Sequence, residues 1–112
     1  MANTRHASLT PETQAALLRL LEVAHRDTGQ SRKVAAFLLA WWNAEECGGF
    51  DLTDLWGLDT CLRMDVVRIV AFVATREHYP DTLGFGSEFK QVIRLWRPHL
   101  LEAPYVSPLE EQ

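Results

Sequence analysis

Acidic and aromatic side chains occur together between Lys33 and Arg63 in this 112-residue chain. Between these two cations lie five carboxylates and no Lys or Arg, so the local formal charge is −5. In protein interfaces aromatic rings supply contact area, and carboxylates steer a basic partner toward its site. The sequence therefore predicts a protein-binding surface here, and the residues expected to form it are Trp41, Trp42, Glu45, Glu46, Phe50, Asp51, Asp54 and Trp56.

A purely structural role for the same residues stays open. Asp51, Asp54 and Asp59 each stand where a helix cap or a turn favours a carboxylate. The tryptophans of the segment then belong to the core, and the acids form a solvated rim. The two interpretations differ in one observable property, which is whether the aromatic rings are exposed.

A second candidate surface is basic. Lys90, Arg94 and Arg97 follow one another at spacings of four and three, which places them on one stripe of a helix. Such a stripe can contact phosphates, so nucleic-acid binding is the alternative function. The whole chain has a formal charge of −4 and a pI near 5.5, which argues against a surface built throughout for nucleic acid.

The spacing of the remaining residues gives little support for a metal site, a cofactor site or a catalytic site. Cys47 and Cys61 are fourteen positions apart and could meet His25 and His78 only through the fold, without any close pair of metal ligands. We expect both thiols to be small buried hydrophobic groups. The Gly84-Phe85-Gly86 segment lacks the third glycine of a dinucleotide-binding loop and is interpreted as a turn. The prediction is a protein without enzymatic activity, metal or cofactor.

The composition is that of one globular domain, with 47% apolar and 23% charged residues. The first ten residues lack the apolar region of a secretory signal, and no apolar run reaches the length of a membrane span. With only two cysteines, a disulfide-dependent secreted domain is not favoured. We expect a cytoplasmic protein away from membranes, either a monomer or a homodimer.

The elements that must position these residues are helical. Thr10-Pro11-Glu12 is a helix start, and the apolar spacing predicts a helix over about 11–28 that ends at Gly29. A second helix is expected from a cap at Ser31 to Gly48-Gly49. Its run from Val34 to Trp42 is apolar on every side, which indicates a central helix surrounded by the others.

Two more helices complete the predicted compact all-α bundle of about four helices. One begins after a cap at Asp59, extends to about His78, and is expected to pack through Leu62, Val66, Ile69, Val70 and Val73. The other begins at Ser87 and ends near Trp96, with Phe89, Val92, Ile93 and Trp96 inward. A single helical turn is expected around 53–56. The predicted organisation is a flexible N-terminus over 1–9, a helical domain over 10–97 and an extended tail over 98–112, packed in part through Leu100, Leu101 and Tyr105.

The segment from Ala35 to Trp56, with its Ala-Trp-Trp-Asn-Ala-Glu-Glu-Cys-Gly-Gly-Phe run, resembles a family of short bacterial proteins carried by plasmids and integrative elements of Gram-negative bacteria. The likeness continues through Tyr79-Pro80-Asp81 and Gly84-Phe85-Gly86 to Trp96-Arg97-Pro98. It implies a mobile-element accessory or inhibitor protein in a bacterial cytoplasm. It transfers no catalytic or ligand-binding residue to this sequence.

Overall fold

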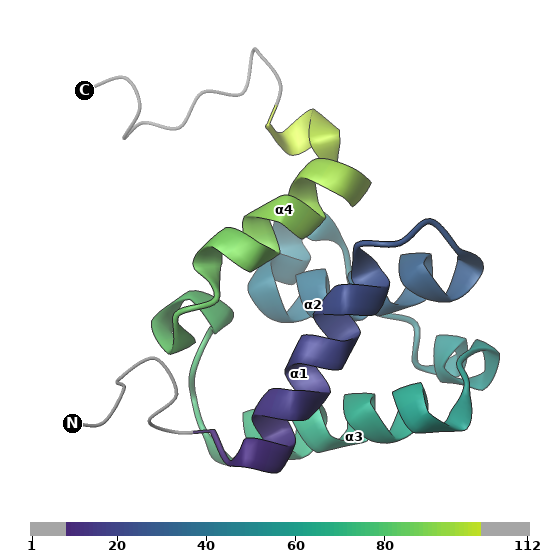
Figure 1. Ribbon diagram of the computed structural model, residues 1–112. Helices are drawn as coiled ribbons and strands as arrows, with labels where there is room; N and C mark the ends of the chain where they lie inside the picture. The colour runs from purple at the N-terminus through teal and green to yellow at the C-terminus, as the bar shows by residue number, and fades with distance from the viewer. Residues whose placement is uncertain (1–8, 102–112) are drawn as a thin grey trace.

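The computed structural model describes residues 9–101, and within that range the chain is all-α, as predicted. Figure 1 shows four α-helices joined by loops and short 3-10 helices, with no strand in the described range. The elements in chain order are α1 (Pro11–Ala24), α2 (Gly29–Cys47), η2 (Leu52–Gly57), α3 (Thr60–Thr75), η3 (Pro80–Leu83), α4 (Gly86–Trp96) and η4 (Pro98–Leu100).

Helix α1 begins as the sequence predicts. The Thr10 hydroxyl accepts a hydrogen bond from the backbone N–H of Thr13 at 3.1 Å, and Pro11 occupies the first turn. The predicted end at residue 28 and Gly29 is wrong, because α1 ends at Ala24 and Gly29 is the first residue of α2. The predicted cap of α2 at Ser31 is also wrong. Thr28 is the N-cap, and its hydroxyl accepts from the Ser31 N–H at 3.0 Å.

Helix α2 contains the apolar run from Val34 to Trp42, in which no residue is exposed. All nine residues of this run are buried or half-buried, as predicted, but α1 rather than α2 is the helix that packs closely against the three other α-helices. The helix is interrupted at Asn43, whose backbone is extended and whose side-chain oxygen accepts from the Glu46 N–H at 3.2 Å. The last turn ends at Gly48, where the φ of 97° is one that glycine adopts without a steric cost.

Helix α3 differs from the prediction in its end and in its inner face. It ends at Thr75 rather than His78. Leu62, Val66 and Ile69 are buried as expected, but Val70 and Val73 are 50% and 39% exposed, so their predicted burial is wrong. The buried stripe continues instead through Asp65 and Phe72. Residues 70 and 73 each follow a buried residue by one position, which is about 100° around the helix and turns them off the core.

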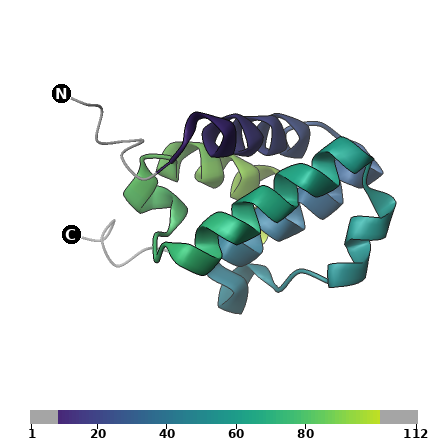
Figure 2. The same cartoon turned by 90° about the horizontal axis from the view of Figure 1, so that it is seen from below.

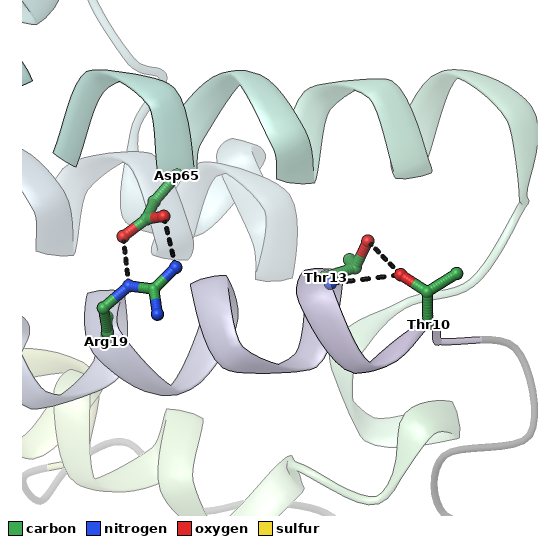
Figure 3. Close-up of polar contacts among 4 residues, drawn as sticks. All are labelled: Thr10, Thr13, Arg19 and Asp65. Carbon is green, nitrogen blue, oxygen red and sulfur yellow. Dashed lines mark hydrogen bonds and ion pairs between the residues drawn. The ribbon is translucent and has the colours of Figure 1, made fainter. Parts of the chain in front are cut away.

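An ion pair joins α1 to α3 at the position of the buried Asp65 (Figure 3). The Nε and Nη2 atoms of Arg19 donate to the two carboxylate oxygens of Asp65, both at 2.9 Å. The hydrogen bond and the charge of Asp65 raise the pKa of Arg19. Both oxygens of the buried carboxylate therefore accept a hydrogen bond from Arg19. This bidentate ion pair explains how a charged residue can lie on the buried face of α3.

The helices do not enclose the core evenly. Helix α1 packs against α2, α3 and α4, and Figure 2 shows it beside α3. Helix α2 packs mainly against α1, α4 and η2. The backbones of α2 and α3 hardly approach each other, and large side chains bridge the space between them. At the far side α4 buries Phe89, Val92 and Ile93, and the Trp96 indole N–H donates to the Ala24 carbonyl at 2.7 Å. The separation of α2 from α3 leaves room for the surface described below.

The segment beyond α4 begins with η4 rather than with extended chain. Leu100 is half-buried against the core and Leu101 is 42% exposed. The prediction that Tyr105 packs on the domain concerns a position outside the described residues, as do the predictions for residues 1–8.

Candidate functional site

The space between the separated helices α2 and α3 is an apolar groove. Its volume is about 390 Å³, and η2 closes one side. We call this surface the apolar groove; its lining residues are Phe37, Ala40, Trp41, Phe50, Leu52, Leu55, Val66, Val67, Val70 and Val73. No lining residue carries a charge. Two residues of the predicted protein-binding surface, Trp41 and Phe50, lie in it.

Of the four predicted aromatic residues, three pack against other aromatic rings and one is mostly exposed to solvent. Trp42 stacks on Phe89 with ring centroids 5.7 Å apart. Trp41 contacts Phe89 edge-on, and Phe50 meets Phe37 edge-on at 5.4 Å. These three rings are half-buried, whereas Trp56 on η2 is 74% exposed. The aromatic set is therefore partly core and partly surface, so each interpretation of the sequence holds for some of its members.

The predicted acids also have different roles. Glu45 and Glu46 are exposed on the last turn of α2, and Asp54 is half-buried within η2. Asp51 caps η2, because its carboxylate accepts from the Thr53 hydroxyl at 2.8 Å and from the Thr53 N–H at 2.9 Å. These two bonds lower the pKa of Asp51, the hydroxyl bond more than the backbone bond. Asp51 therefore has a structural role that its position in the sequence had suggested.

A second concavity adjoins the apolar groove at Ala40 and Trp41, which line both. It has a volume of about 630 Å³, and we call it the aromatic-acidic hollow; its lining residues are Ala40, Trp41, Trp42, Asn43, Ala44, Glu45, Tyr79 and Asp81. Sequence reasoning placed Trp41, Trp42 and Glu45 of this set on a candidate surface but missed Tyr79 and Asp81. In the sequence these two residues stand out only in the Tyr79-Pro80-Asp81 stretch that carries the family resemblance. Their aromatic and acidic side chains were the signal that could have linked them to the surface.

The basic stripe predicted on the last helix is only partly available. Lys90 and Arg94 are exposed on α4. Arg97 is half-buried at the end of the helix, where its Nε donates to the Cys47 carbonyl and its Nη1 to the Trp96 carbonyl, both at 2.9 Å. Arg97 thus ties α4 to the end of α2, and the three cations do not form one free surface.

The two cysteines differ, contrary to the expectation that both are buried. Cys47 is buried at the end of α2, but Cys61 is exposed on the first turn of α3. Burial raises the pKa of the Cys47 thiol, and the nearby charge of Arg97 opposes that change in part. Within residues 9–101, no group of three or more His, Cys, Asp and Glu side chains is arranged to hold a metal ion.

This difference predicts selective alkylation. A raised pKa leaves less thiolate at a given pH, and the thiolate is the reactive form, so Cys47 should react slowly in the folded protein. We expect iodoacetamide at pH 8 to add one label to the native chain, at Cys61, and two labels in denaturant, as measured by intact and peptide mass spectrometry. The Cys61→Ser variant is the control and should stay unlabelled while folded. Rapid labelling of native Cys47 would contradict the prediction.

The comparisons with known proteins identify a family. The profile described as a family of unknown function, DUF7673, matches residues 14–97, which include all four α-helices almost completely. Neither a curated protein nor a solved structure shows significant similarity to the chain. In the described residues, no helix has the length and apolar character needed to cross a membrane. Since the match spans most of the sequence and nearly all of the four α-helices, the chain belongs to this family of unknown function, DUF7673.

Proposed function

We propose that this protein is a non-enzymatic module that binds another protein, with the apolar groove as its contact surface. The observation that carries the proposal is that this groove is lined without any charged residue and yet is open to solvent. Its walls include Leu52 at 69% exposure, Val70 at 50% and Val67 at 49%. A contiguous exposed apolar surface of this kind is typical of protein interaction sites.

The groove is also held in shape before any partner arrives. Arg63 on α3 donates to the carbonyls of Leu58 and Trp56, both at 2.9 Å, which fixes η2 against α3. The edge-on contact of Phe50 with Phe37 holds the preceding loop against α2. A preformed surface avoids the entropic cost of ordering on binding, so more of the contact free energy is available for affinity.

Protein rather than nucleic acid is the proposed partner because of the charges on α4. With Arg97 bonded to two backbone carbonyls, the α4 stripe offers only Lys90 and Arg94 to phosphates. Nucleic-acid binding remains the alternative function, and a steep fall of affinity with salt would reveal it. The role of a mobile-element accessory or inhibitor, and a bacterial cytoplasmic location, rest on the resemblance described above and are part of the proposal.

The experiment places a charge in the groove. Short peptides are selected by display against the wild-type chain, and their affinities for wild type and for Val70→Glu are compared by calorimetry. We expect Val70→Glu to weaken binding about tenfold or more, because a carboxylate in an apolar contact loses its hydration without gaining a partner. The melting temperature should change little, since Val70 is half exposed.

The matched control is Ala74→Glu, which adds the same charge at an exposed position of the same helix that does not line the groove. It should bind the peptides like wild type. Chemical-shift mapping of the bound peptides should centre on α2, η2 and α3. Peptides that bind Val70→Glu and wild type equally well, or that map to another face, would show that the groove is not the binding surface.

A further inference from the structure

The aromatic-acidic hollow is a separate site from the apolar groove, although Ala40 and Trp41 line both. Three aromatic side chains contribute to it, namely Trp41, Trp42 and Tyr79. Two carboxylates complete it, with Glu45 from the last turn of α2 and Asp81 from η3. No Lys, Arg or His lines the hollow, so its lining residues carry a formal charge of −2 from these two acids.

The rings are held with surface left for a ligand. Trp42 stacks on Phe89 at an interplanar angle of 17°, so one ring face is covered by the core, and Trp42 also lines the hollow. The Trp41 indole N–H donates to the His78 carbonyl at 3.0 Å, which anchors the chain beside Tyr79. The Tyr79 side chain is 62% exposed. An aromatic wall is therefore fixed from two segments far apart in the sequence.

The backbone segments that carry the two acids are held by local hydrogen bonds, and both acid side chains are exposed. The Asn43 side-chain oxygen accepts from the Glu46 N–H, which fixes the turn that carries Glu45. Asp81 lies in η3, whose end is closed by the Gly84 N–H donating to the Asp81 carbonyl at 3.1 Å. The two acids come from different elements, and both line the hollow, so their negative charges act together on a cation bound there.

We propose that the hollow binds an organic ammonium group, either a small alkylammonium molecule or the side chain of a lysine. Aromatic faces attract such cations through the negative charge of the ring face, and the attraction is stronger where water is displaced. The carboxylates compensate the charge. An alkylated ammonium fits better than a metal ion, because its apolar substituents contact the rings. This inference goes beyond the proposed function and does not depend on the groove.

The probe is choline, and its control is 3,3-dimethyl-1-butanol, which has the same shape without the charge. Titration of the full chain is followed by the indole N–H resonances and by calorimetry. We expect choline to shift the Trp41 and Trp42 signals and to bind at least about fivefold more tightly than the neutral alcohol. N-acetyl-lysine amide tests the second source. Tighter binding of choline assigns a free alkylammonium ligand, and tighter binding of the lysine derivative assigns a protein side chain.

Variants separate the site from the fold. Tyr79→Ala and the double variant Glu45→Gln/Asp81→Asn should each lose most of the choline affinity, with unchanged melting temperatures because these side chains are exposed. Glu46→Gln changes a neighbouring exposed acid outside the lining and should bind like wild type. Val70→Glu should also retain choline binding, so failure of the groove proposal would be seen separately. Equal affinity for choline and the neutral alcohol, or full binding by the double variant, would overturn the proposal.

Discussion

Replacing Phe89 by alanine is expected to lower the free energy of unfolding by about 3–5 kcal/mol, the range for removing a buried aromatic ring. Phe89 is fully buried on α4. It stacks on Trp42 and meets Trp41 edge-on at 5.9 Å, with an interplanar angle of 88°. Its removal leaves a cavity and takes away contacts of both indoles, and neighbouring helices can close such a space only in part.

Urea unfolding followed by tryptophan fluorescence measures this loss, since the indoles next to Phe89 report on the same region. Leu95→Ala is the matched control on α4, because Leu95 is 51% exposed and should change stability by less than about 0.5 kcal/mol. A loss below about 1 kcal/mol for Phe89→Ala would mean that α4 is not firmly docked on α2. The tryptophan surfaces of both concavities would then lack a fixed support.

Much of the fold could be predicted because its signals are local. The Thr10-Pro11 start and the Gly48 end follow from the chemistry of individual residues, and the structure confirms both. The boundary between α1 and α2 was predicted wrongly, because a glycine after an apolar pattern is typical of a helix end. Here the Thr28 hydroxyl caps the following helix and Gly29 lies inside it. The glycine favours a helix end and the threonine favours a helix start, and the sequence alone does not show which of the two preferences decides the boundary.

The candidate site was predicted in its residue types but not in its shape. The aromatic and acidic segment does border both concavities, because Trp41 lines both of them, Phe50 lines the groove and Glu45 lines the hollow. The groove itself depends on the separation of α2 from α3. This separation is set by the packing of the whole domain. Val70 was predicted in the core because its spacing fits an apolar stripe. In the structure, the face of α3 that carries Val70 lines the groove instead. Periodicity shows which residues share one face of a helix, but it does not show which part of that face packs against another helix.

Long-range polar contacts were beyond sequence reasoning for a related reason. Arg97 reaches the Cys47 carbonyl, and Asp65 pairs with Arg19 across forty-six positions. A charged residue at regular helical spacing suggests a solvated face, and nothing in its own neighbours reveals a distant partner. The basic stripe therefore looked larger in sequence than it is in the structure.

Replacing Trp56 by alanine is the change expected to affect partner binding most. Trp56 extends from η2, the element whose Leu52 and Leu55 form one side of the groove. Its 74% exposure is the largest among the exposed apolar side chains of the described chain. A tryptophan that is buried only in the complex typically contributes about 2 kcal/mol or more to affinity, which is roughly a thirtyfold change in Kd.

The affinity loss of Trp56→Ala should come without a loss of stability, and this separates recognition from folding. The exposed ring makes little contribution to the core, so the free energy of unfolding should change by less than about 0.5 kcal/mol. Trp42→Ala is the matched comparison, because Trp42 stacks on Phe89 and its removal should destabilise the fold. Calorimetry with the display-selected peptides measures affinity, and urea unfolding measures stability. If Trp56→Ala bound the peptides like wild type, recognition would have to lie within the groove walls alone, since Val70 and Leu52 would still offer their apolar surface without this ring.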